Sequence, residues 1–300
     1  MNKEKIDLSK PKKEYEKFQK ESESLVDELK IDKEEQEEEI LEEELEAKFW
    51  EDLYKEKLEE VLDDKDFKEA AIGDLEYNIE KIQNGDSEDA NYIFENISAY
   101  KNLEIFKKLS EEKLEQVKDD DNFQESAISN LEYSFQRGQK DNGFYANFAI
   151  KNISTYKNLG IFNEIVNKKL EEIKNDENFK QAVINNLEDN IWRGKSNHVS
   201  WAMRAISNCQ NLGVFEKVVE EKLDEIKGNE SFKRLIIIDL ENNIQNGQKG
   251  DSHSANLVIR TISNYKNISK YYQKLAEEKK AKQARKEDKD ENIPKRPEIK

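Results

Sequence analysis

The sequence is poor in the residues on which several protein classes depend. Among 300 residues it has one cysteine, three prolines and ten glycines, and hydrophobic residues make up 35% of the chain. A single cysteine, Cys209, excludes a framework of internal disulfides and suits a reducing compartment. No run of about 18 apolar residues is present, and the N-terminus lacks the apolar stretch of a secretory signal. We therefore expect a cytoplasmic protein without a membrane span.

Basic residues are outnumbered by acidic ones. The chain has 50 Lys and Arg against 67 Asp and Glu, which gives a formal net charge of −17. Because affinity for the phosphate backbone comes from clustered Lys and Arg, this balance disfavours nucleic acid as a partner. The usual catalytic motifs (GxxxxGK[ST], GxGxxG, HExxH, CxxC and GxSxG) are also absent. We expect no enzymatic activity, no catalytic residue and no cofactor.

What the sequence does contain is one unit repeated four times. The segment KLEEVLDDKDF at Lys57 recurs in related form at Lys113, Lys169 and Lys222, at intervals of 56, 56 and 53 residues. A single unit cannot bury its own apolar face, so such repeats stack on their neighbours. Three apolar columns keep the register: Phe67, Phe123, Phe179 and Phe232; Leu75, Leu131, Leu187 and Leu240; and Ile97, Ile153, Ile206 and Ile262.

Each unit is predicted to form three helices, because its apolar residues recur three and four positions apart. The sequence shows no sustained two-residue alternation, so the fold class is all-α. The first helix of a unit is expected to begin after a capping asparagine: Asn102, Asn158 or Asn211. The second is expected to end near a left-handed glycine: Gly138, Gly194 or Gly247.

Tandem three-helix units resemble the armadillo and HEAT α-solenoids, here over about residues 47–275. The resemblance is architectural, because these units exceed the roughly 40–47 residues usual in those families. It implies a right-handed α-solenoid with four repeats, at 47–102, 103–158, 159–211 and 212–267, and a polar cap helix at 268–280. We expect residues 1–46 to form an acidic, helical and partly disordered arm, and residues 281–300 a charged, disordered tail.

The third helix of each unit carries a second pattern on the face opposite its core stripe. An aromatic or apolar column is followed three residues later by a mostly basic column, and a small or polar column lies one turn beyond the first. Trp201 and Arg204 have the spacing of a cation–π pair. The candidate site residues are Tyr92, Phe148, Trp201, Leu257, Lys151, Arg204, Arg260, Asn208 and Asn264.

Two interpretations of this face stay open. Armadillo-like solenoids line their concave groove with the third helix, so the resemblance implies a binding groove with cationic rungs. Alternatively, the aromatic residues pack between repeats, and a column with three basic residues out of four arises about once by chance in such a chain. A cleaner lysine column (Lys57, Lys113, Lys169 and Lys222) is expected only to solvate the first helix.

The remaining candidates for chemistry are isolated. His198 and His253 lie in loops of different repeats, whereas a metal site needs three or four converging ligands, so no metal site is expected. Cys209 occupies the column of Tyr100, Tyr156 and Tyr265, where a small buried residue is expected rather than a nucleophile.

The expected function is that of a non-enzymatic scaffold that binds a peptide or protein segment in the groove. Stacked helices lie about 8–10 Å apart and an extended chain advances about 3.3–3.6 Å per residue. The cations would therefore match acidic ligand residues about three positions apart. Two alternatives stay open: a nucleic-acid-associated helical-repeat protein, and a structural or acidic-mimic protein that acts through the Glu-rich arm near Glu34.

Overall fold

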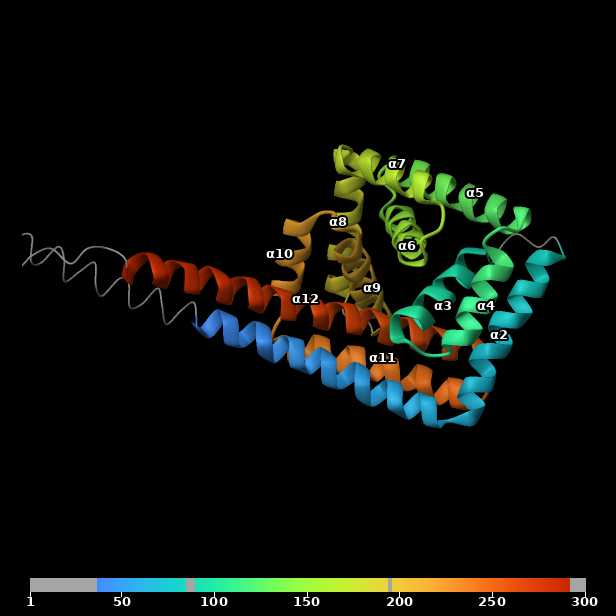
Figure 1. Ribbon diagram of the computed structural model, residues 1–300, viewed down its shortest axis with the longest axis horizontal. Helices are drawn as coiled ribbons and strands as arrows, with labels where there is room; N and C mark the ends of the chain where they lie inside the picture. Colours follow the sequence, from blue (N-terminus) through green and yellow to red (C-terminus); the bar gives the residue numbers. More distant parts are fainter. Residues whose placement is uncertain (1–36, 85–89, 194–195, 292–300) are drawn as a thin grey trace, which may run out of the picture. The chain divides into compact units, whose positions relative to one another are not determined.

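The computed structural model describes residues 37–84, 90–193 and 196–291, and these residues are helical without a strand (Figure 1). The predicted all-α fold is thereby confirmed for this part of the chain. Within it, no helix is both long enough and apolar enough to cross a membrane. A first helix covers residues 37–63 and is followed by α2 (Lys65–Gln83), α3 (Ala90–Leu103), α4 (Lys107–Val117), α5 (Asp121–Gly138), α6 (Gly143–Leu159), α7 (Asn163–Lys174), α8 (Glu177–Arg193), α9 (Ser196–Leu212), α10 (Glu216–Ile226), α11 (Glu230–Gln248) and α12 (Ser252–Glu291).

These helices divide into two compact units. One unit contains residues 46–271. The other contains the described residues 37–45 and 272–291. In this smaller unit, the Lys279 ammonium lies 2.9 Å from Glu43 and 3.4 Å from Glu39. These ion pairs join the start of helix 37–63 to the end of α12.

The C-terminal flank is more helical than the sequence predicted, and the N-terminal arm is helical where the structure describes it. Residues 37–46 of the expected arm belong to helix 37–63, and the rest of the arm lies outside the described residues. Of the expected disordered tail, residues 281–291 continue α12, whereas residues 292–300 lie outside the described residues. The expected separate cap helix is also absent as such, because residues 268–280 lie inside α12.

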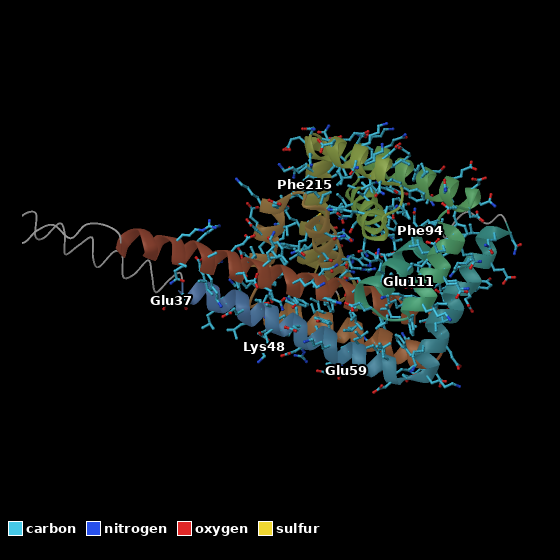
Figure 2. The ribbon with its side chains drawn as sticks, viewed as in Figure 1. Glu37, Lys48, Glu59, Phe94, Glu111 and Phe215 are labelled. Atoms are coloured by element: carbon cyan, nitrogen blue, oxygen red, sulfur yellow. The ribbon has the colours of Figure 1, made fainter. Side chains whose placement is uncertain are left out.

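Within residues 46–271, the second helices frame the third helices. Figure 1 shows α2, α5, α8 and α11 around α3, α6, α9 and the beginning of α12. The three predicted apolar columns are buried in all four copies. Side chains fill the space between the helices (Figure 2), and Phe94 there makes edge contacts with the rings of Phe123, Tyr156 and Phe162. These ring contacts join the first repeat to the second and third.

The four repeats close into a ring through the lysine column. Each lysine on the first helix of a repeat forms an ion pair with a glutamate on the second helix of the preceding repeat. The first repeat pairs in this way with the last. The pairs are Lys113–Glu76 at 3.2 Å, Lys169–Glu132 at 2.9 Å, Lys222–Glu188 at 3.1 Å and Lys57–Glu241 at 3.6 Å. The expectation that these lysines only solvate their helix is wrong.

Hydrogen bonds between the third helices close the same ring. Near the end of each third helix, an asparagine donates its side-chain N–H to a serine of the neighbouring third helix, again with the first repeat joined to the fourth. The Nδ2–Oγ distances are 2.7 Å for Asn158–Ser98, 2.8 Å for Asn211–Ser154, 3.2 Å for Asn267–Ser207 and 2.8 Å for Asn102–Ser263. An open solenoid has no contact between its ends, so the expected solenoid is wrong in this respect.

Two of the predicted capping glycines have a different role. Gly138 is the last residue of α5 and Gly247 the second-last of α11, so these helices end near the two glycines as predicted, but neither glycine has a positive φ. A Cβ on Gly138 would lie 2.7 Å from the Phe179 ring, and one on Gly247 would lie 2.6 Å from the Phe67 ring. Glycine is therefore needed for close packing between second helices of neighbouring repeats. Gly194 lies outside the described residues.

The turns between third and first helices also differ from the prediction. Asn102, Asn158 and Asn211 lie in the last turn of a third helix rather than before a first helix. The left-handed residue comes two positions later, as at Gly160 with φ 75°, and the next N–H bonds back to the helix, from Ile161 to Tyr156. This is the Schellman pattern, in which an apolar residue follows the left-handed one.

The fourth copy lacks this turn. At the position of the buried Ile161 it has Lys270, whose side chain is exposed. Without an apolar residue there, the turn loses the contact that accompanies it. The absence of this residue explains why α12 continues where the other third helices end.

Candidate functional site

The third helices, α3, α6, α9 and the beginning of α12, are the inner helices of the ring. They run in the same direction along its axis and enclose two cavities. Residues from the N-terminal parts of α3, α6, α9 and α12 line one cavity, which has about 1490 Å³ of empty space including its open edge. We call this the aromatic mouth, because Tyr133, Tyr145 and Phe148 contribute to its wall. Residues from the last turns, together with α12 up to Asn267, line the second cavity of about 510 Å³. We call the second cavity the asparagine mouth.

A cluster of charges separates the two cavities. Glu95 Oε2 lies 3.1 Å from Lys151 Nζ and 2.8 Å from an Arg260 guanidinium nitrogen. The side chains of these three residues are between 6% and 20% exposed. All three line both cavities, and Arg204 lines the aromatic mouth beside them. We refer to Glu95, Lys151, Arg204 and Arg260 as the central cluster. Its formal charge is +2.

The charges of the cluster control its ionisation. Burial raises the pKa of Glu95, but the nearby charges of Arg260, Lys151 and Arg204 have the larger combined effect. They lower this pKa to about 2. Burial lowers the pKa of Lys151, and attraction to Glu95 only partly offsets this effect. Burial likewise lowers the pKa of Arg204. The carboxylate therefore stays ionised, and the cations compete for its single charge.

The basic residues of the cluster differ in how well they are satisfied. Arg204 forms no ion pair within the described residues; its Nε makes a 3.4 Å hydrogen bond to the Ser200 carbonyl. Asp239 also lines the aromatic mouth, where it accepts a 2.5 Å hydrogen bond from Ser200. In Arg260, the buried Nε has no partner in the same part of the chain. Within the described residues, guanidinium N–H groups at the floor of the aromatic mouth thus lack hydrogen-bond acceptors.

The predicted aromatic column lines the aromatic mouth, and its members Phe148 and Trp201 are not buried between repeats. Phe148 is 39% exposed and Trp201 is 42% exposed, whereas Tyr92 and Leu257 are half-buried. Tyr92 donates to Asp74 at 2.8 Å, and the Arg260 guanidinium lies 4.5 Å from its ring centre. Lys151 lies 4.2 Å from the ring centre of Phe148. The cation–π pair predicted for Trp201 and Arg204 is not found among the described contacts.

A side slot opens from the aromatic mouth between α6, α8 and α9. It has about 1100 Å³ of empty space including its open edge. Phe144, Phe148 and Trp201 contribute its apolar surface, and Lys151 and Arg204 lie where it meets the central cluster. The ring centres of Phe144 and Phe148 are 4.8 Å apart. The slot therefore presents exposed rings next to cationic groups.

The polar column predicted beyond the aromatic one lies on the other side of the cluster. Asn264 lines the asparagine mouth, and Asn208 lines both that mouth and the side slot. Three lysines at this end donate to the last carbonyl groups of neighbouring helices, with Lys101 bonding to Asn158 O at 2.7 Å. The other two bonds are Lys157 to Asn211 O at 2.9 Å and Lys266 to Asn102 O at 2.7 Å. These lysines satisfy helix ends rather than a ligand.

The structure thus brings most of the predicted residues together, but in a different arrangement. Lys151 and Arg260 contact one oxygen of Glu95, so the cations converge and are not spaced by one repeat each. Convergence follows from ring closure, which turns the third helices inward from all sides. Two features of the sequence point to it: a glutamate column (Glu76, Glu132, Glu188 and Glu241) keeps step with the lysine column, and one acidic residue, Glu95, interrupts the basic column.

The isolated candidates are placed as ordinary structural residues. Cys209 is fully buried, and burial raises its pKa to about 12. His253 stacks on Tyr92, and His198 lies 2.9 Å from the Asn190 side chain. Among residues 37–84, 90–193 and 196–291, no group of three or more His, Cys, Asp or Glu side chains is placed to hold a metal ion.

Comparison of the chain with protein-family models, with curated proteins and with solved structures finds no match.

Proposed function

We propose that the protein is a non-enzymatic binding module that takes an acidic group of a partner protein segment at the aromatic mouth. One observation carries the proposal. In a chain with a net charge of −17, a cluster with charge +2 forms the floor of a cavity whose walls are aromatic. Arg204 at that floor has no ion pair among the described residues. An arginine without a carboxylate partner is the group that an acidic ligand needs.

The walls of the mouth supply the second component of binding. Tyr, Trp and Arg are the residues that most often dominate binding energy at protein interfaces. Trp201 and Phe148 offer exposed ring surface within one helical turn of Arg204 and Lys151, respectively. Burial of that surface on binding would strengthen the electrostatic attraction, because it removes water from the cations. The aromatic and basic residues thus act as one surface.

This proposal revises the ligand geometry expected from the sequence. Acidic ligand residues spaced three positions apart would need cations spaced along a groove, whereas these cations converge on one carboxylate. One acidic group therefore suffices. We keep the cytoplasm as the proposed location. A single buried cysteine is compatible with this reducing compartment. The alternative, a structural or acidic-mimic role of the Glu-rich arm near Glu34, concerns a segment of which residues 37–46 belong to helix 37–63 and the rest lies outside the described residues.

To test the proposal, the full chain is used as bait to select binders from a library of displayed random 12-residue peptides. The library is made in two formats. In one format the peptide has a blocked C-terminus, and in the other it has a free one. We expect enrichment of peptides that carry an acidic group beside a bulky apolar residue. Arg204→Met should weaken their binding at least tenfold, because it keeps the length of the side chain but removes its charge. Trp201→Ala should also weaken binding.

Two control variants match these changes. Arg234 on α11 and Trp192 on α8 are exposed and line neither the aromatic mouth nor the side slot. Arg234→Met and Trp192→Ala should leave binding unchanged. Equal binding by the Arg204→Met variant with an intact helical spectrum, or no enrichment in either format, would refute the proposal. If a single-stranded oligonucleotide bound instead, with affinity dependent on Arg204, nucleic acid would replace the protein partner.

A further inference from the structure

We infer that the acidic group taken by the central cluster is the terminal carboxylate of a protein chain, and that the side slot holds the bulky apolar side chain of its last residue. This inference rests on the proposed function and specifies its ligand. It follows from three features of the cavity: its charge, its closed floor and the place where the slot meets the cluster.

The charge of the aromatic mouth matches a single negative charge. Lys151, Arg204 and Arg260 are its three strong cations, and Glu95 and Asp239 are its two carboxylates. The formal sum is +1. One carboxylate neutralises this charge, whereas a phosphate monoester with about two negative charges would leave the cavity with a net negative charge. A buried, uncompensated charge is costly, so the count favours a carboxylate.

The floor of the cavity is closed by ion pairs. Glu95, Lys151 and Arg260 line both the aromatic mouth and the asparagine mouth, so the contacts between them stand between the two cavities. A polypeptide therefore cannot thread through the ring without breaking these contacts. A chain end can reach the floor without turning back, whereas an internal segment must fold into a hairpin inside the cavity. A terminal carboxylate is thus the simplest acidic group to deliver there.

The side slot begins where that carboxylate would lie. Lys151 and Arg204 belong both to the wall of the slot and to the central cluster. The last side chain of a peptide branches from the carbon atom that carries the terminal carboxylate. A carboxylate bound to Arg204 therefore places this side chain near Trp201 and Phe148, whose rings are 42% and 39% exposed. A bulky apolar side chain would cover both rings, which favours its burial.

The direction of the inner helices supports entry from this side. The aromatic mouth is lined by residues from the N-terminal parts of α3, α6 and α12, and the last turns line the opposite cavity. Helix N-termini carry partial positive charge, so the aromatic mouth is the end at which an anion is favoured. At the other end, Lys101, Lys157 and Lys266 already occupy carbonyl groups. The partial positive charge of the helix N-termini and the guanidinium groups of the central cluster therefore both favour entry of an anion at the aromatic mouth.

The test uses the full chain and forty fluorescein-labelled decapeptides. All share a Gly-Ser sequence, and they differ only in the last residue, which is each of the twenty amino acids, and in a free or amidated C-terminus. Fluorescence polarisation measures Kd. We expect free acids that end in Phe, Trp, Leu or Met to bind at least tenfold more tightly than their amides. We also expect them to bind more tightly than free acids that end in Ser or Gly.

The variants separate the two parts of the inference. Arg204→Met should abolish the difference between free acid and amide, whereas Phe148→Ala should reduce the preference for an apolar last residue. Arg234→Met should change neither. Equal binding of acids and amides would overturn the inference. The same holds if N-acetylphenylalanine binds as tightly as the decapeptide that ends in Phe, because the site would then recognise a small organic acid.

The outcomes also separate this inference from the proposed function. If the display selection enriches blocked peptides with internal Asp or Glu, and no free terminus improves their binding, the proposed function stands and the chain-end inference fails. If neither display format nor any of the forty peptides yields a binder, both fail.

Discussion

A single methyl group added at Gly247 tests whether the ring is closed. Gly247 lies in α11 of the last repeat, and a Cβ at this position would lie 2.6 Å and 2.7 Å from two carbons of the Phe67 ring in the first repeat. It would also lie 3.2 Å from the Ala255 Cα. Contacts below 3 Å force neighbouring atoms to move. Gly247→Ala should therefore destabilise the protein even though alanine favours a helix.

The size of the effect follows from two opposing terms. Overpacking of a dense interior costs about 1–3 kcal/mol, and replacement of a helical glycine by alanine gains about 0.5–1 kcal/mol. The net change in the free energy of unfolding should be a loss of up to about 2.5 kcal/mol. Gly73 in α2 is the matched control, because it is helical and exposed and a Cβ there meets nothing within 4 Å. Gly73→Ala should gain about 0.5–1 kcal/mol.

Urea denaturation followed by circular dichroism measures both variants, and an unchanged slope with urea shows that only stability has altered. Phe67→Leu should reduce the penalty of Gly247→Ala, because it shortens the ring that the new methyl group meets. If the ends of the repeat array did not touch, the new methyl group would not meet Phe67, and Phe67→Leu would leave the effect of Gly247→Ala unchanged. That result would refute ring closure.

Three further predictions follow from the same contacts. Alanine at both Asn102 and Ser263 should show a coupling free energy of about 1 kcal/mol in a double-mutant cycle by urea denaturation, because their hydrogen bond joins the first and fourth repeats; zero coupling would contradict the bond. The folded-state pKa of Glu95 is about 2, below the usual 4.5, so its contribution to stability should be complete above about pH 4.5 and lost as the pH falls toward 2. Glu95→Gln should flatten the stability curve across this window, and an unchanged curve would refute the ion pairs. The Cys209 thiol, buried and with its pKa raised to about 12, should react with a thiol reagent such as a disulfide dye only on unfolding; fast labelling of the native protein would show that it is exposed.

The helices and their buried faces could be predicted because they depend on local periodicity. Apolar residues three and four positions apart fix which side of a helix turns inward, and the columns of Phe67, Leu75 and Ile97 are buried as this rule requires. The continuation of α12 could also have been inferred, since Lys270 replaces the apolar residue of the turn in the other copies. The relevant signal was the residue after the left-handed position, not the asparagine before it.

Ring closure could not be predicted in this way, because it depends on the angle between successive repeats. That angle is set by contacts such as the one between Gly138 and the Phe179 ring, where a single missing Cβ allows close approach. Such contacts recur from copy to copy, so the periodicity indicates that neighbouring repeats pack together but does not give the angle between them. The geometry of the candidate site could not be predicted for the same reason. Its residues were found from their columns, but their convergence on Glu95 required the ring.

The closed ring also explains why one column is not uniformly basic. If Glu95 were basic like Lys151, Arg204 and Arg260, four cations would face one another at the centre of the ring with no counter-charge within the cluster. Burying like charges is unfavourable, and their repulsion in a poorly hydrated interior would oppose closure. One carboxylate that forms two of the contacts removes the conflict while leaving the cluster positive. The departure from the repeat at Glu95 therefore permits a closed ring to keep a cationic centre. In the described part of the chain Arg204 has no ion pair there, which leaves its charge for the acidic ligand that we propose.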